Sequence, residues 1–89
     1  MRLDVFLKIS RIISRRSLAQ EFCDAGRITV NGQTSRSSKE VKTGDEIAIK
    51  RHDRISRFLV IAVPNKKQVS KEASATLFRV IAEEAIDEI

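Results

Sequence analysis

The segment that decides the fold runs from Ser10 to Gly32 and reads SRIISRRSLAQEFCDAGRITVNG. Leu18 and Phe22 lie four residues apart, and small apolar residues around them extend one face of a short helix. Gly26 ends this helix, because glycine adopts a left-handed backbone without steric penalty. Residues 27–30 alternate polar and β-branched side chains as a strand does, and the Asn-Gly pair that follows is a strong hairpin signal. An amphipathic helix therefore leads directly into a β-hairpin.

The residues before this segment predict another helix. Residues 2–13 carry Leu3 and Phe6 on one apolar face, at a spacing of three. Ser14 or Ser17 is the expected N-cap of the second helix, because a hydroxyl there accepts a hydrogen bond from an otherwise unpaired amide. The chain thus begins with two helices.

The residues after the hairpin predict further strands. A polar stretch at 33–40 reads as a short returning strand and a loop. Residues 46–50 and 56–63 are rich in β-branched side chains and predict two strands. Residues 1–64 are therefore expected to form one domain.

The last part of the chain, 65–89, reads as a charged linker followed by a C-terminal helix. Ser70 is a good N-cap, and Leu77, Val80 and Ile81 would form the apolar face. The acidic end, 83–89, is expected to fray, because carboxylates oppose the helix dipole there. The predicted fold class is α+β, with two N-terminal helices packed on a small twisted, mainly antiparallel sheet, plus this C-terminal helix.

Charge is distributed unevenly along the 89 residues, whose net charge is +5. Residues 1–71 contain sixteen Lys and Arg against seven Asp and Glu, whereas residues 72–89 contain one Arg and five acids. A basic excess favours a polyanion such as nucleic acid as partner, with the last helix outside that surface. The alternative is that these scattered cations only keep the protein soluble.

Several classes of protein are not favoured by the composition. A single cysteine, Cys23, cannot form an internal disulfide and fits a reducing cytoplasm, where we expect it to be a buried apolar residue. No apolar run is long enough to span a membrane. The lone His52 has no catalytic or metal-ligating companions, and no phosphate loop is present, so we expect no catalytic residues, no metal and no cofactor.

Basic residues gather around the two predicted helices. Lys8 and Arg11 are neighbours on the first helix, while Arg15 and Arg16 open the second helix, where the helix dipole disfavours cations. Such repulsion is relieved when a phosphate binds between the cations. In the loop after the hairpin, Arg36 and Lys39 stand among hydroxyl side chains that suit phosphate and sugar contacts.

Four motifs together resemble the S-four RNA-binding domain. They are RLDVFLK at 2–8, RxxxRR at 11–16, AxxxxxxGRIxVNG at 19–32 and SxxVKTGDEI at 38–47. The whole chain is similar to the small stand-alone bacterial proteins of the RqcP type. The resemblance implies an S-four-like fold that binds structured RNA. Its basic helical surface corresponds to Arg2, Lys8, Arg11, Arg15 and Arg16 of this chain.

The resemblance also implies the biological setting. It implies a non-catalytic, monomeric cytoplasmic factor whose partners are large-subunit ribosomal RNA and peptidyl-tRNA on stalled ribosomes. It would support template-free alanine tailing of the nascent chain by a partner protein. Two alternatives stay open: an adaptor that docks a protein through Leu77, Val80 and Ile81, and a heat-shock-type factor that recycles stalled large subunits.

Overall fold

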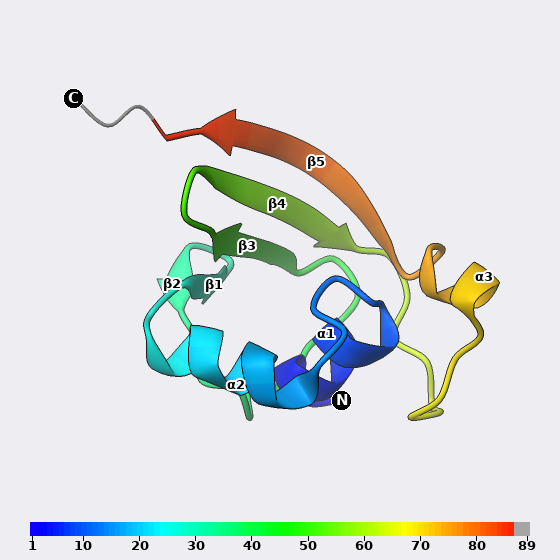
Figure 1. Ribbon diagram of the computed structural model, residues 1–89. Coiled ribbons are helices and arrows are strands. Elements are labelled where there is room, and N and C mark those ends of the chain that lie inside the picture. The colour runs from blue at the N-terminus through cyan, green and yellow to red at the C-terminus, as the bar shows by residue number, and fades with distance from the viewer. Residues whose placement is uncertain (87–89) are drawn as a thin grey trace.

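The computed structural model describes residues 1–86. Its elements are α1 (Leu3–Ile9), α2 (Arg16–Asp24), β1 (Ile28–Val30), β2 (Gln33–Thr34), β3 (Glu46–Lys50), β4 (Arg54–Val60), α3 (Lys71–Ser74) and β5 (Phe78–Ala85). The strands form one five-stranded antiparallel sheet in the order β2-β1-β3-β4-β5, with α1 and α2 packed together on one side of it (Figure 1). This arrangement confirms the predicted α+β class. The end expected to fray, 83–89, is paired with β4 over residues 83–85, and residues 87–89 lie outside the described residues.

The core lies between the two N-terminal helices and the middle of the sheet. Leu3, Phe6 and Leu7 of α1 are completely buried, and so are Ile47 and Ile49 of β3. Burying a side chain of this size stabilises the fold by about 1.5–3 kcal/mol. The alternating burial along β4 follows from the two-residue period of a strand, which turns every second side chain toward the core.

The first helix is shorter than predicted, and the second begins differently. α1 ends at Ile9, because Arg11 adopts a left-handed backbone with φ 64° that continues no helix. This turn brings Ile13 into the core, where it is 5% exposed. The N-cap of α2 is Arg15 and has no side-chain cap, so the prediction of Ser14 or Ser17 is wrong.

The hairpin prediction is confirmed. Asn31 and Gly32 have φ values of 53° and 83°, and two consecutive left-handed residues define the tight turn that suits twisted strands. The Asn31 side chain also ties the hairpin to β3, because its Nδ2 donates to Asp45 Oδ1 at 3.1 Å and its Oδ1 accepts from the Glu46 amide at 3.0 Å. The turn is therefore locked by side-chain bonds as well as by backbone preference.

The predicted C-terminal helix is wrong over most of its length. The Ser70 hydroxyl does cap a helix, accepting from the Ala73 amide at 3.2 Å, but this helix ends at Ser74. Residues 78–85 instead form β5, which pairs with the whole of β4. The free edge of β4 offers backbone partners along its length, and such tertiary context overrides local helix propensity.

The apolar residues of this region are correspondingly redistributed. Leu77 is buried in the core and Phe78 packs edge-on against Phe58 of β4, with ring centroids 5.6 Å apart. Val80 and Ile81 are half-exposed on the sheet edge. The helical face through which an adaptor was expected to dock a partner therefore does not exist in this fold.

Candidate nucleic-acid interface

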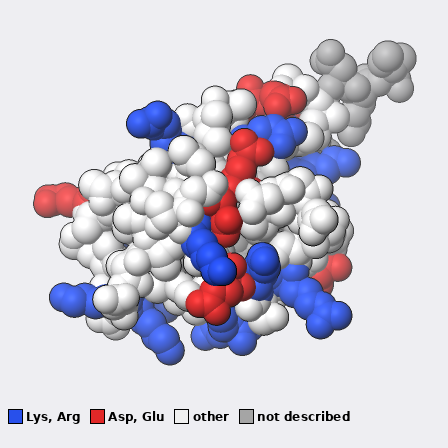
Figure 2. Space-filling view, turned by 180° about the vertical axis from the view of Figure 1, so that it is seen from behind, with Lys and Arg blue, Asp and Glu red and all other residues white. Residues whose placement is uncertain are grey.

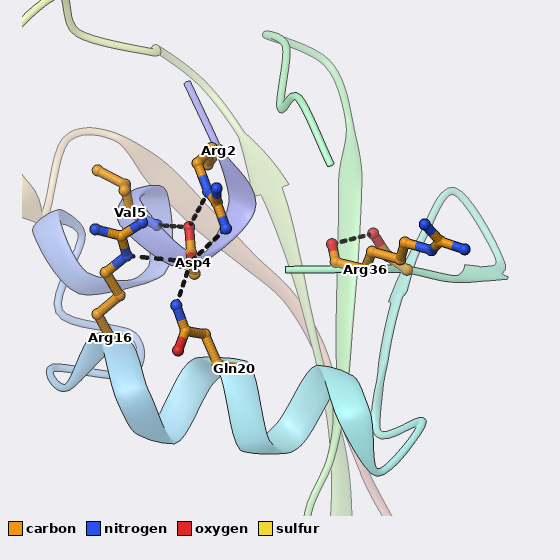
Figure 3. Close-up of polar contacts among 7 residues, drawn as sticks. Arg2, Asp4, Val5, Arg16, Gln20 and Arg36 are labelled. Atoms are coloured by element: carbon orange, nitrogen blue, oxygen red, sulfur yellow. Dashed lines mark hydrogen bonds and ion pairs between the residues drawn. The ribbon is translucent and has the colours of Figure 1, made fainter. Parts of the chain in front are cut away.

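A buried carboxylate joins the starts of the two helices. Asp4, in the first turn of α1, is inaccessible to solvent. Arg2 donates to it through Nε and Nη2 at 3.1 and 3.2 Å, and Arg16 donates through Nε at 3.1 Å. Gln20, one turn after Arg16 on α2, donates at 2.9 Å, and the Val5 amide at 2.8 Å (Figure 3). We call Asp4, Arg2, Arg16 and Gln20 the Asp4 clamp.

The electrostatics of the clamp keep Asp4 ionised. Burial opposes the charged carboxylate, but hydrogen bonds from Gln20, Arg2 and Arg16 and the charge of Arg16 outweigh burial, so the pKa of Asp4 lies below its ordinary value of 3.8. The single negative charge of Asp4 therefore faces the two positive charges of Arg2 and Arg16. The clamp keeps an excess of one positive charge toward solvent.

The guanidinium groups of the clamp are hydrogen-bonded to Asp4 on one side and exposed to solvent on the other. The side chains of Arg2 and Arg16 are 48% and 46% exposed. Among the described residues, Arg16 directs only its Nε at Asp4, so its terminal amino groups stay available to an anion. The geometry presents two oriented guanidinium groups on the protein surface, which is suited to binding phosphate.

The loop after the hairpin is attached to the start of α1. The carbonyls of Lys39 and Ser37 accept from the amides of Leu3 and Asp4, at 2.8 and 3.1 Å, so the loop satisfies the first donors of the helix. The predicted loop residue Arg36 nevertheless lies apart from the Asp4 clamp (Figure 3). The structure separates the loop candidates from the arginines of the clamp.

The seven predicted site residues fall into three shallow hollows and one isolated position. The clamp hollow contains Arg2 and Arg16, the helix-end hollow contains Lys8 and Arg11, and the hairpin hollow contains Arg36 and Lys39. Arg15 is exposed at the N-cap of α2 and lies in none of these three. The prediction of one helical surface that holds the first five residues is therefore only a partial description.

The view from behind shows how charge is distributed. Most of the Lys and Arg side chains on that face lie in its lower half, at the height of α1 and α2, and acidic side chains reach its upper edge beside β5 (Figure 2). On the sheet, Arg57 is paired with acids, because its guanidinium lies 2.9 Å from Glu84 and 4.0 Å from Glu46. The sheet around Arg57 is therefore neutralised within the protein, unlike the clamp.

Three residues that position or extend the basic face, Asp4, Gln20 and Lys67, are absent from the site residues predicted from the sequence. From the sequence alone, Asp4 is only an acid in the first turn of a helix, where the dipole favours it, and Gln20 is only the third residue after Ser17 in a weak capping-box pattern. Lys67, from the predicted linker, lines both the clamp hollow and the helix-end hollow. The spacing of Arg16 and Gln20, four residues apart on one helix face, was a usable signal that both point at the same group.

Other predicted features have simple structural outcomes. Cys23 is buried, and burial together with the charges of Asp4 and Asp24 raises the pKa of its thiol to about 11. His52 is exposed in the turn between β3 and β4, as predicted. Within residues 1–86, no three His, Cys, Asp or Glu side chains gather in a way that could hold a metal ion, and no helix is long and apolar enough to cross a membrane.

Comparison with known proteins places the chain in a family. The sequence model of the S4 domain matches residues 1–47. A Halalkalibacterium halodurans protein named RQC P-site tRNA stabilizing factor is 46% identical over 97% of this chain and 96% of its own. The Bacillus subtilis protein of that name is 42% identical over 99% and 100%. The trimeric structure of Vibrio cholerae heat shock protein 15 superposes with a TM-score of 0.80 at 28% identity, covering 92% of this chain and 82% of that one. The chain therefore belongs to the S4 domain family, and within it to the RQC P-site tRNA stabilizing factors.

Proposed function

We propose that this protein is a non-catalytic RNA-binding factor that acts on the large ribosomal subunit during rescue of stalled ribosomes. It binds ribosomal RNA and the transfer RNA that carries the stalled chain. The observation that carries the proposal is the Asp4 clamp, which holds Arg2 and Arg16, from opposite sides of a helix junction, in fixed orientations on an exposed basic face.

The chemistry of the face suits recognition of RNA by shape and backbone. Arginine forks bind phosphate oxygens in two-point contacts that carry no base sequence. Base stacking would need exposed aromatic rings, but Phe6 and Phe58 are buried, and Phe22 and Phe78 are partly covered. The surface is thus suited to the backbone of folded RNA rather than to splayed single-stranded bases.

The role on the ribosome follows from binding alone. The name of the similar Halalkalibacterium and Bacillus proteins refers to stabilising a transfer RNA in the P site. By binding that transfer RNA and the adjacent ribosomal RNA, this protein would raise the population of the positioned state. A partner protein would then add alanine residues to the nascent chain without a template, and this protein would supply no chemical group to that reaction.

Co-sedimentation with purified ribosomal subunits tests the proposal. We expect the native chain to pellet with large subunits and the Arg16→Ala variant to remain mostly in the supernatant. Binding should weaken steeply as salt rises, because phosphate contacts release counterions. The matched control is Arg54→Ala, which removes an equal charge from an exposed position on β4, outside the three hollows. Equal pelleting of the native chain and Arg16→Ala would contradict the proposal.

Recycling of stalled large subunits is the second candidate, favoured by the structural similarity to heat shock protein 15. The two functions share RNA binding and differ in outcome. A reconstituted reaction containing stalled large subunits and the tailing enzyme separates them, because alanine tails should lengthen when this protein is added. Release of the subunits without longer tails would favour recycling instead.

A further inference from the structure

The segment between β4 and α3 returns across the start of the protein. Pro64 and Lys67 line the clamp hollow beside Arg2, while Lys67 and Val69 line the helix-end hollow. The backbone carbonyl of Val69 lies 3.5 Å from Nη2 of Arg11. The segment 64–69 is therefore folded against the basic hollows, although it lies outside the residues that match the S4 domain.

Lys67 stands where the two hollows meet. Val5 belongs to the clamp hollow and Ile9 to the helix-end hollow, and these residues are one turn apart on α1. A helix rises 1.5 Å per residue, so four residues separate the hollows by roughly 6 Å along α1. Positive side chains thus follow one another along α1, with Lys67 shared between the hollows.

The acidic groups around these hollows do not neutralise the cations. Asp4 lies beneath the arginines and balances only one of their two charges. Glu40 lines the clamp hollow, but its Oε1 lies 3.3 Å from the amino group of Met1. Among the described residues, Lys67 forms no ion pair with any carboxylate. Cations brought together in this way repel one another until an external polyanion binds.

We propose that Lys67 contacts a backbone phosphate of the bound RNA, and that the segment 64–69 joins the clamp hollow and the helix-end hollow into one track for a single RNA strand. Arg2 and Arg16 hold the strand on one side of Lys67, and Lys8 and Arg11 hold it on the other. The proposal rests on the proposed function and adds a binding element from outside the S4 domain.

A pair of neighbouring lysines provides the test. Lys66 and Lys67 are both exposed, but Lys66 lines neither hollow. We would measure the dissociation constant for large-subunit RNA over a range of salt concentrations with the native chain, Lys66→Ala, Lys67→Ala and Arg16→Ala. Each phosphate contact contributes about 0.7–0.9 to the slope of log affinity against log salt. Lys67→Ala should lower the slope by about that amount and weaken binding several-fold, whereas Lys66→Ala should keep the native slope.

The results distinguish this inference from the proposed function. Lys66→Ala and Lys67→Ala with the same affinity and slope would overturn the inference, since only overall charge would then matter. If Arg16→Ala also bound like the native chain, the proposed function would fail as well. Thermal unfolding followed by circular dichroism checks that every variant is folded, which we expect because both lysines are exposed.

Discussion

Replacing Asp4 by asparagine separates positioning of the arginines from simple charge attraction. The substitution keeps the shape of the side chain, removes the buried negative charge and exchanges one acceptor oxygen for an amino group. In the native protein, Oδ2 accepts from Arg2, Arg16 and Gln20. An amino group there would face three donors, of which only the Gln20 amide can turn to present an oxygen.

The expected loss of stability can be worked from these contacts. A hydrogen bond to a charged group contributes about 1.5–3 kcal/mol, and removing one partner of a buried ion pair costs about 3–5 kcal/mol. Arg2 and Arg16 are about half exposed, so water replaces part of what they lose. We therefore expect Asp4→Asn to lower the free energy of unfolding by about 2–3 kcal/mol, or the melting temperature by about 10–20 °C.

The pH dependence gives an independent check. The pKa of Asp4 is lowered in the folded state from its ordinary value of 3.8, so its contribution to stability is present above that value and is lost as pH falls through the folded pKa. The stability gap between the native chain and Asp4→Asn should stay constant between about pH 7 and 5 and narrow below about pH 4. Urea unfolding at several pH values measures this gap.

RNA binding supplies the result that would refute the reasoning. Asp4→Asn makes the protein more positive by one charge, so charge attraction alone predicts tighter binding. Positioning by the clamp predicts weaker binding, because Arg2 and Arg16 lose their fixed orientation. The control is Asp24→Asn, an equal charge change at an exposed position in the last turn of α2. If Asp4→Asn matched that control in both stability and affinity, the clamp would have no role.

Three further predictions concern other parts of the fold. Because burial and nearby carboxylates raise the pKa of Cys23 to about 11, its thiol should react slowly with Ellman's reagent at about pH 8 and rapidly once urea unfolds the chain. Phe78→Ala should cost about 2 kcal/mol in urea unfolding, because the ring packs on Phe58 of the adjacent strand, and the exposed neighbour Arg79→Ala should cost under about 0.5 kcal/mol. Gly32→Ala should cost about 1 kcal/mol in the same assay, because φ is 83° there, and a smaller change would contradict the turn geometry.

The parts of the fold that the sequence predicts well are those determined locally. The hairpin at Asn31 and Gly32 requires two left-handed residues in succession, and few residue pairs other than Asn-Gly adopt that geometry at low cost. In β3, Ile47 and Ile49 lie two residues apart, as the period of a strand predicts for one face, and both are completely buried. In both cases the residues that carry the signal lie within a few positions of the structure they specify.

The parts that escape prediction depend on distant partners. Residues 78–85 have the apolar spacing of a helix, but β4 presents an unpaired edge on which the same residues form a strand. Val80 and Ile81 are β-branched and fit either a helix or a strand locally, so pairing with β4 determines that this segment is a strand. The position of Lys67 has the same origin, because the fold of segment 64–69 against α1 leaves no periodic pattern in the sequence.

The Asp4 clamp also explains why the cation of Arg16 is tolerated at the start of a helix. Cations at a helix N-terminus are unfavourable, and the sequence alone suggested that a bound phosphate relieves the repulsion. The structure shows that the protein supplies one anion itself, since the Asp4 carboxylate lies 3.1 Å from Arg16 Nε. Because that single carboxylate also pairs with Arg2, one of the two positive charges of Arg2 and Arg16 remains uncompensated. The Asp4 carboxylate fixes the side chains of Arg2 and Arg16 in place, and the remaining positive charge attracts an external phosphate. The internal carboxylate and a bound phosphate therefore both relieve the repulsion at this site.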